Sequence, residues 1–188
     1  MNKKKKTIII ITILVVAAAG VWACCHFCMD KKGGKEVDEV VASMDRLIPG
    51  LSGGNRQNTG NGRDPLAALS IDGLDVVGCL EVPTLDIKVP VLSKGVKKDG
   101  FVTWESGSPV SGAFRLTGDR NGVFRDIDDA DPGAQVYFTD IDGVCYSYKV
   151  STQYHLKDWS EADNDLLLCY RVDDDTVFVL GCMYDFSN

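Results

Sequence analysis

The chain has 188 residues, of which 45% are hydrophobic and 25% charged, so its composition fits one ordinary globular domain with an added tail or anchor. Its net charge is −7 at pH 7, and its lysines gather at positions 3–6 rather than in a stripe with interleaved aromatic residues. This distribution excludes a phosphate-neutralising surface, and no nucleic-acid partner is expected.

The N-terminal segment has the pattern of a membrane anchor. Residues 1–6 form a basic tail, and residues 7–29 are an apolar run long enough to cross the ~30 Å core of a bilayer as a helix. Because positive residues favour the cytoplasmic side, the sequence predicts a single-pass cell-membrane protein with a cytoplasmic N-terminus and an extracytoplasmic domain. The alternative is a secretory signal that is removed, with Cys24 as a loose match to a lipoprotein cleavage site.

Residues 30–64 are expected to connect the anchor to the domain. Apolar residues recur at spacings of three and four between residues 30 and 48, which predicts a short juxtamembrane helix. Pro49-Gly50 ends this helix, and the Gly- and Asn-rich sequence that continues to residue 64 predicts a flexible linker.

Residues 65–188 are dominated by β-strand signals. Strands are predicted at 76–82, 87–92, 113–117, 135–139, 144–151 and 176–182, and helical turns at 123–129 and 160–168. Short strands with turn signals at intervals of roughly ten residues are typical of all-β domains. The predicted fold is therefore mainly β, a closed or nearly closed β-barrel with short helices, preceded by one transmembrane helix.

The cysteines do not form an obvious disulfide framework, because there are seven of them and they are widely scattered. Cys24, Cys25 and Cys28 lie close together, but this spacing is too tight for a tetrahedral zinc site and no second ligand pair follows. No metal and no cofactor are predicted.

Three segments in the β-rich region carry motifs, at residues 78–91, 114–127 and 177–182. In this order they resemble the opening strand pair, the central Gly-His-Arg block and the final Leu-x-Thr-Cys strand of the sortase family of cysteine transpeptidases. The resemblance covers residues 64–188, and Asp64-Pro65 is similar to the lid dipeptide of the pilin-polymerising members. It implies a sortase-like β-barrel.

The resemblance also implies a mechanism and a set of site residues. Cys182 falls in the position of the nucleophile, Asp119 in the position of the histidine, and Arg120 is a candidate for the cation beside the thiol. The family arginine that follows the cysteine is not found before the sequence ends at Asn188. Because a carboxylate beside a thiol disfavours the thiolate, the sequence predicts an impaired enzyme.

The implied substrates are C-terminal sorting-motif peptides of surface proteins, joined to an amine from a cell-wall precursor or a pilin lysine. The alternatives are a catalytically inactive sortase-like module that binds peptides at the membrane surface, or a truncated pseudoenzyme. His155 is a further candidate for the base, in place of the family's histidine. Cys182 and Asp119 are expected to face a shared groove, and the strand at 177–182 is expected to form an open sheet edge.

Overall fold

The computed structural model describes residues 34–48, 50–51, 62–159 and 162–186. This part of the chain is mainly β, with a nine-stranded sheet and one α-helix at residues 34–47. The helix confirms the one predicted between residues 30 and 48. The predicted basic tail and anchor, and most of the predicted linker, lie outside the described residues. Among the described residues, no helix is both long and apolar enough to span a bilayer.

The strands follow one another with two short 3-10 turns between them. Their bounds are β1 (Leu69–Ile71), β2 (Leu74–Val82), η1 (Pro83–Leu85), β3 (Ile87–Leu92), β4 (Val102–Ser108), β5 (Gly112–Thr117), η2 (Ile127–Asp129), β6 (Gln135–Asp140), β7 (Cys145–Leu156), β8 (Leu166–Arg171) and β9 (Val177–Tyr184).

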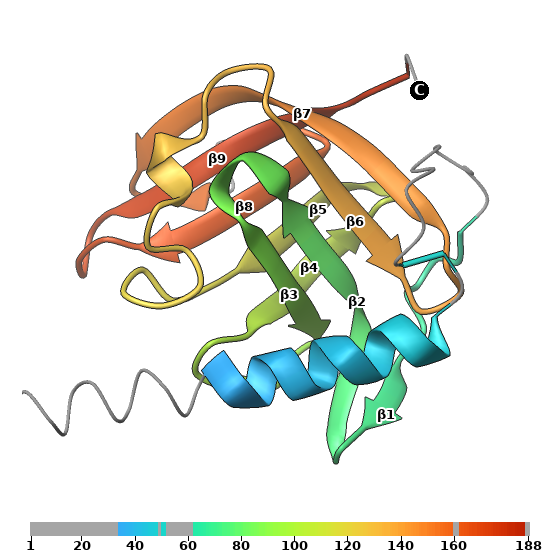
Figure 1. The fold of residues 1–188 in the computed structure, drawn as a ribbon. Helices are drawn as coiled ribbons and strands as arrows, with labels where there is room; N and C mark the ends of the chain where they lie inside the picture. The colour runs from blue at the N-terminus through green and yellow to red at the C-terminus, as the bar shows by residue number, and fades with distance from the viewer. Residues whose placement is uncertain (1–33, 49, 52–61, 160–161, 187–188) are drawn as a thin grey trace, which may run out of the picture. The chain divides into compact units, whose positions relative to one another are not determined.

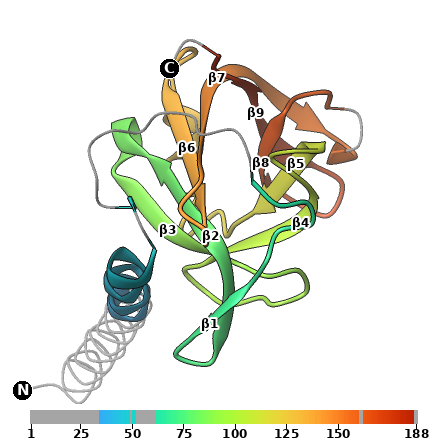
Figure 2. The ribbon, with the colours of Figure 1, turned by 90° about the vertical axis from the view of Figure 1, so that its right-hand side faces the viewer.

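The sheet closes on itself, as Figures 1 and 2 show. The strand order is β1-β2-β3-β4-β5-β8-β9-β7-β6, and β6 pairs in turn with β2, so that only β1 stands outside the ring. The pairs β3–β4 and β5–β8 are parallel, and the remaining pairs are antiparallel. In the parallel β5–β8 pair, two strands distant in sequence end at the same place.

The predicted open edge at residues 177–182 is wrong. β9 pairs with β8 on one side and with β7 on the other, so Cys182 lies opposite both Leu166 and Val150. The backbone groups of this strand therefore have sheet neighbours on both sides.

The predicted helix at 160–168 is also wrong where the structure describes it, because Leu166–Arg171 is strand β8. Leu166 and Leu168 pack in the main core, whereas Leu167 belongs to a second cluster on the other side of the sheet. A strand buried on both faces reads as a continuous apolar run, which periodicity alone cannot distinguish from a helix. The strand β4 was not predicted for a different reason: its sequence is rich in Ser, Thr and Gly.

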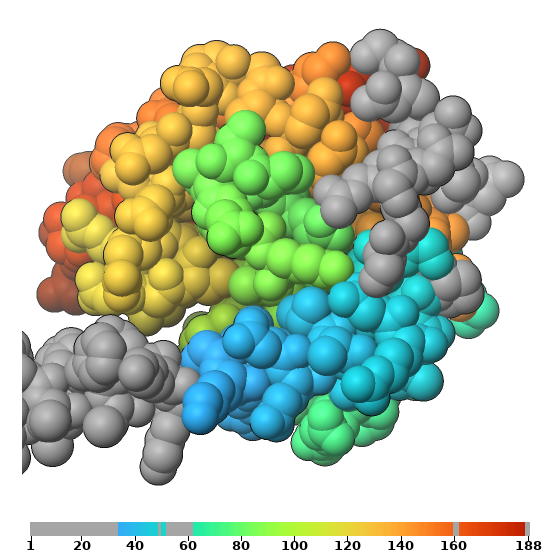
Figure 3. Space-filling model, viewed as in Figure 1, coloured from blue at the N-terminus to red at the C-terminus, as the bar shows by residue number. Residues whose placement is uncertain are grey.

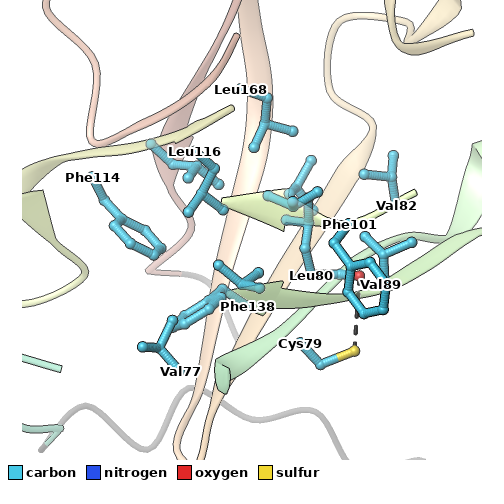
Figure 4. Packing of buried hydrophobic residues seen from close by; sticks show 14 of the residues in the cluster. Val77, Cys79, Leu80, Val82, Val89, Phe101, Phe114, Leu116, Phe138 and Leu168 are labelled. Atoms are coloured by element: carbon cyan, nitrogen blue, oxygen red, sulfur yellow. Dashed lines mark hydrogen bonds between the residues drawn. The ribbon is translucent and has the colours of Figure 1, made fainter. Parts of the chain in front are cut away.

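The main core lies inside the ring of strands. Alternate residues of β5 and β6 point inward, so Phe114 and Phe138 meet edge to face with ring centroids 4.8 Å apart. Figure 4 shows these rings together with Leu116 and Leu168, all four labelled among the buried residues. Full burial of such side chains contributes roughly 1.5–3 kcal/mol each. The alternate residues of β5 and β8 point to the outside of the ring and do not belong to this core.

The helix at 34–47 packs with the same core through one apolar face. Val37, Val40 and Met44 are buried members of the main cluster at helical spacings. The Asp45 carboxylate forms a 2.9 Å ion pair with Lys88 of β3. Figure 3 shows the helix, blue to cyan, lying against the green surface of the neighbouring strands.

Candidate active site

Cys182 is a core residue in the structure. It lies in β9 opposite Leu166, is fully buried, and belongs to the main hydrophobic cluster. Burial raises the pKa of its thiol well above the ordinary value. Cys182 thus packs in the core as a small apolar side chain.

Asp119 lies elsewhere, in the exposed loop directly after β5. Its Oδ1 accepts a hydrogen bond of 3.2 Å from the backbone N–H of Asn121. Cys182 aligns through Leu166 with Phe114, so Asp119 lies five residues, or roughly 16 Å, further along the β5 direction. The structure does not bring Cys182 and Asp119 into a shared groove, and that prediction is corrected.

A different cysteine, Cys169, stands beside the Asp119 loop. β5 and β8 run parallel, and Cys169 of β8 is the register partner of Thr117 at the end of β5. The backbone N–H of Gly118 donates to the carbonyl oxygen of Cys169 over 3.1 Å. Cys169 therefore lies across the parallel pair from Thr117, which is two residues before Asp119. Asp119 is the position at which the sortase resemblance implies a histidine.

The Cys169 side chain faces the outside of the ring. Its cluster consists of Leu167, Cys169, Val177 and Val179, against which Trp159 and three other residues pack. Cys169 is fully buried under this cover, and burial raises the pKa of its thiol to about 12. The positive charge of Arg115 opposes this rise, whereas the carboxylate of Glu105 adds to it.

A groove of about 390 Å³ opens next to this position. Its walls combine the end of β5, the start of β4 and the end of β8, with Trp159 as an aromatic wall. The lining residues are Lys97, Lys98, Asp99, Phe101, Thr103, Glu105, Thr117, Gly118, Asp119, Trp159, Tyr170 and Arg171. Asp119 thus lies in a groove, and the cysteine on the strand paired beside it is Cys169.

Two arginines approach the strand segment that follows Cys169. Arg120 lies with its guanidinium carbon 5.8 Å from the centroid of the Tyr170 ring, and its Nη1 donates to the Val172 carbonyl over 3.5 Å. Arg171 lines the groove and donates to the carbonyl of Asp174 over 3.2 Å. Arg120 therefore lies against the end of β8, at the residue that follows Cys169. β9, the strand after Cys169, carries no arginine.

His155 is placed against β9 instead of the groove, with its ring centroid 5.3 Å from that of Phe178. It is not among the residues that line the groove beside Asp119. Within the described ranges, no group of three or more His, Cys, Asp or Glu side chains is arranged to hold a metal ion.

The fold is similar to that of solved sortases. The crystal structure of sortase C-3 from Streptococcus pneumoniae superposes with a TM-score of 0.50 at 17% sequence identity, over 83% of this chain and 81% of that one. The lid mutant of Streptococcus agalactiae sortase C1 gives a TM-score of 0.50 at 14% identity, over 58% and 69% of the two chains. Sortase E1 from Streptomyces coelicolor, with a tripeptide in its active site, gives 0.48 at 16% identity, over 58% and 88%.

No protein-family model matches the sequence, and no curated protein matches it either. At these identities the structural similarity defines the fold. The chain therefore has a sortase-like fold.

A second segment of the sequence, which ends at Cys169, also resembles the final sortase motif. Leu166-Leu167-Leu168-Cys169 matches Leu-x-Thr-Cys as well as the segment ending at Cys182 does, with Leu168 in place of the threonine. Cys169 is also followed by a further strand, β9, whereas Cys182 lies within β9 itself.

Proposed function

We propose that this protein is a sortase-type cysteine transpeptidase whose nucleophile is Cys169 rather than Cys182. The observation that carries the proposal is the register of the parallel β5–β8 pair, which sets Cys169 opposite Thr117 and beside the groove that contains Asp119. The sortase-like fold supports the assignment of the reaction class. The proposed substrates are C-terminal sorting-motif peptides of surface proteins, and the proposed acceptor is a cell-wall or pilin amine.

The proposed reaction has two acyl transfers. The Cys169 sulfur, as thiolate, adds to the carbonyl carbon of the scissile peptide bond; the C–N bond then breaks, and the leaving amine takes up a proton. A second amine attacks the resulting thioester, which forms a new amide, and the thiol is regenerated with a proton from that amine. Asp119 occupies the position at which the sortase resemblance implies a histidine as general acid, so slow turnover is expected.

The second candidate is a sortase-like module that binds peptides without cleaving them. Two observations favour it: Cys169 is fully buried with a raised thiol pKa, and a carboxylate occupies the position of the histidine. For either candidate we propose, from the sequence of residues 1–29, that the domain is held at the outer surface of a cell membrane.

Acyl-enzyme formation separates the two candidates. The full chain is incubated with a panel of sorting-motif peptides, and the mass gained at each cysteine is measured. Transpeptidase activity predicts slow acylation that Cys169→Ala abolishes and Cys182→Ala retains, the latter being a matched control because both thiols are buried. Asp119→His is expected to accelerate acylation by restoring a proton donor. Peptide binding without any acylation would favour the binding module, and acylation at Cys182 would refute the assignment of Cys169.

A further inference from the structure

Arg115 shares a sheet face with Cys169. Phe114 and Leu116 of β5 point into the main core, so Arg115 and Thr117 point to the opposite face. Cys169 points to that face too, as a member of the second cluster, and Thr117 is its register partner. Arg115 is therefore the diagonal neighbour of Cys169 across the parallel pair.

Trp159 holds the guanidinium of Arg115 over this cluster. The guanidinium carbon lies 5.4 Å from the centroid of the Trp159 ring, and Nη2 donates to the Trp159 carbonyl oxygen over 3.5 Å. Trp159 also packs on the cluster that contains Cys169. The same residue thus covers the thiol and fixes the cation next to it.

One donor of Arg115 is left over in this arrangement. Its Nε is buried and has no hydrogen-bond partner among the described residues. Buried N–H groups in proteins are nearly always paired, so an orphan of this kind indicates a partner that forms in another state of the site. A guanidinium N–H pairs more strongly with an ionised acceptor than with a neutral one.

The electrostatics of Cys169 agree with this geometry. After burial, which raises the pKa of the thiol, the largest influence is the Arg115 charge, which lowers it. Glu105 acts in the opposite direction, and its Oε1 is occupied by a 2.9 Å hydrogen bond from the Thr117 hydroxyl. The other charged groups that line the adjoining groove are Lys97, Lys98, Asp99, Asp119 and Arg171.

We propose that Arg115 supplies the positive charge that stabilises the Cys169 thiolate, in a site where a carboxylate stands in the position of the family's histidine. This inference rests on the proposed function in treating Cys169 as the reactive thiol. Arg115 acts through Cys169 and is a positioning residue. A guanidinium stays protonated throughout, so it can hold an anion but cannot donate a proton to the leaving amine. The site is thus equipped for thiolate formation and lacks a general acid of matching strength.

Charged thiol reagents of equal size test this electrostatic role. The full chain is treated at pH 8 with an anionic and a cationic methanethiosulfonate, and modification of Cys169 is followed by peptide mass spectrometry. A unit charge about 6 Å from the sulfur in water-like surroundings changes each rate about threefold in opposite directions. Arg115→Gln should therefore lower the ratio of the anionic to the cationic rate by about tenfold. Arg115→Lys keeps the charge and should keep most of the ratio.

The matched control is Arg125→Gln, which removes one positive charge from an exposed arginine that donates to the Asn121 carbonyl. It should leave the ratio unchanged. If Arg115 only supported Trp159, its loss would accelerate both reagents equally, and a ratio within twofold of the native value in Arg115→Gln would overturn the inference. Circular dichroism of each variant tests whether it is folded. Arg115→Lys provides a second test of the inference, because it changes the side chain and keeps the positive charge.

The reagent ratio tests the inference about Arg115, and the peptide reaction tests the proposed transpeptidase, so either proposal can be refuted without the other. A chain that shows the tenfold ratio effect but forms no acyl-enzyme with any peptide would keep the inference about Arg115 and refute the transpeptidase. A chain that is acylated at Cys169 but shows no change in the reagent ratio would keep the transpeptidase and refute the inference about Arg115.

Discussion

Replacing Cys182 by serine tests whether this thiol is a core group or a nucleophile. Cys182 is fully buried inside the main cluster, and its Sγ donates only over a long distance, 4.0 Å, to the Leu180 carbonyl oxygen. A hydroxyl at the same place would need an acceptor at about 2.7–3.0 Å to be satisfied. Cys182→Ser therefore buries an unpaired hydroxyl.

The expected cost follows from that geometry. A buried, unsatisfied polar group lowers the free energy of unfolding by about 1–3 kcal/mol. For a domain of this size each kcal/mol shifts Tm by about 2–4 °C, so Cys182→Ser should melt roughly 2–12 °C below the native protein. Cys169→Ser should cost less, because the new hydroxyl would lie on the face that carries the orphan Nε of Arg115.

The assay is urea denaturation and thermal melting of the full chain, followed by far-UV circular dichroism, together with peptide acylation of each variant. The m-value should be unchanged if the loss is confined to native-state packing. The reasoning would be refuted if Cys182→Ser melted like the native protein and also lost acylation. That result would return Cys182 to the role that the sequence motif predicted for it.

Three further predictions concern other parts of the structure. Trp159→Ala should raise the rate at which a neutral thiol reagent modifies Cys169, on the order of tenfold, because the cover over the thiol is removed; an unchanged rate would show that other residues shield it. Gly78→Ala should destabilise the domain by about 1–3 kcal/mol in urea denaturation, because the added Cβ would clash with the Thr139 carbonyl oxygen of β6. Burial raises the pKa of Asp140 above its ordinary value, so the native protein should lose stability as pH rises from the unfolded value of 3.8 through the raised folded pKa. Asp140→Asn should lack this loss and be the more stable variant at pH 7; equal stability of the two proteins from pH 3 to 7 would contradict it.

The sequence by itself determined the fold class and many of the elements. The runs that became β2, β3, β5, β6, β7 and β9 have β-branched and apolar residues bounded by turn signals, which is local information. The helix at 34–47 followed from apolar spacing alone. The motifs also located the loop of Asp119 and Arg120, which lies on the groove in the structure.

The tertiary structure alone decided which cysteine stands beside that loop. Cys169 and Cys182 both end apolar strand-like runs, and no local property of either run distinguishes a thiol that faces the core from one that faces the outer cluster. The distinction depends on the pairing of β8 with β5, whose register partners are separated by more than fifty residues of chain. A shift of one residue in register moves every side chain to the other face, so non-local pairing, rather than the motif, places the thiol.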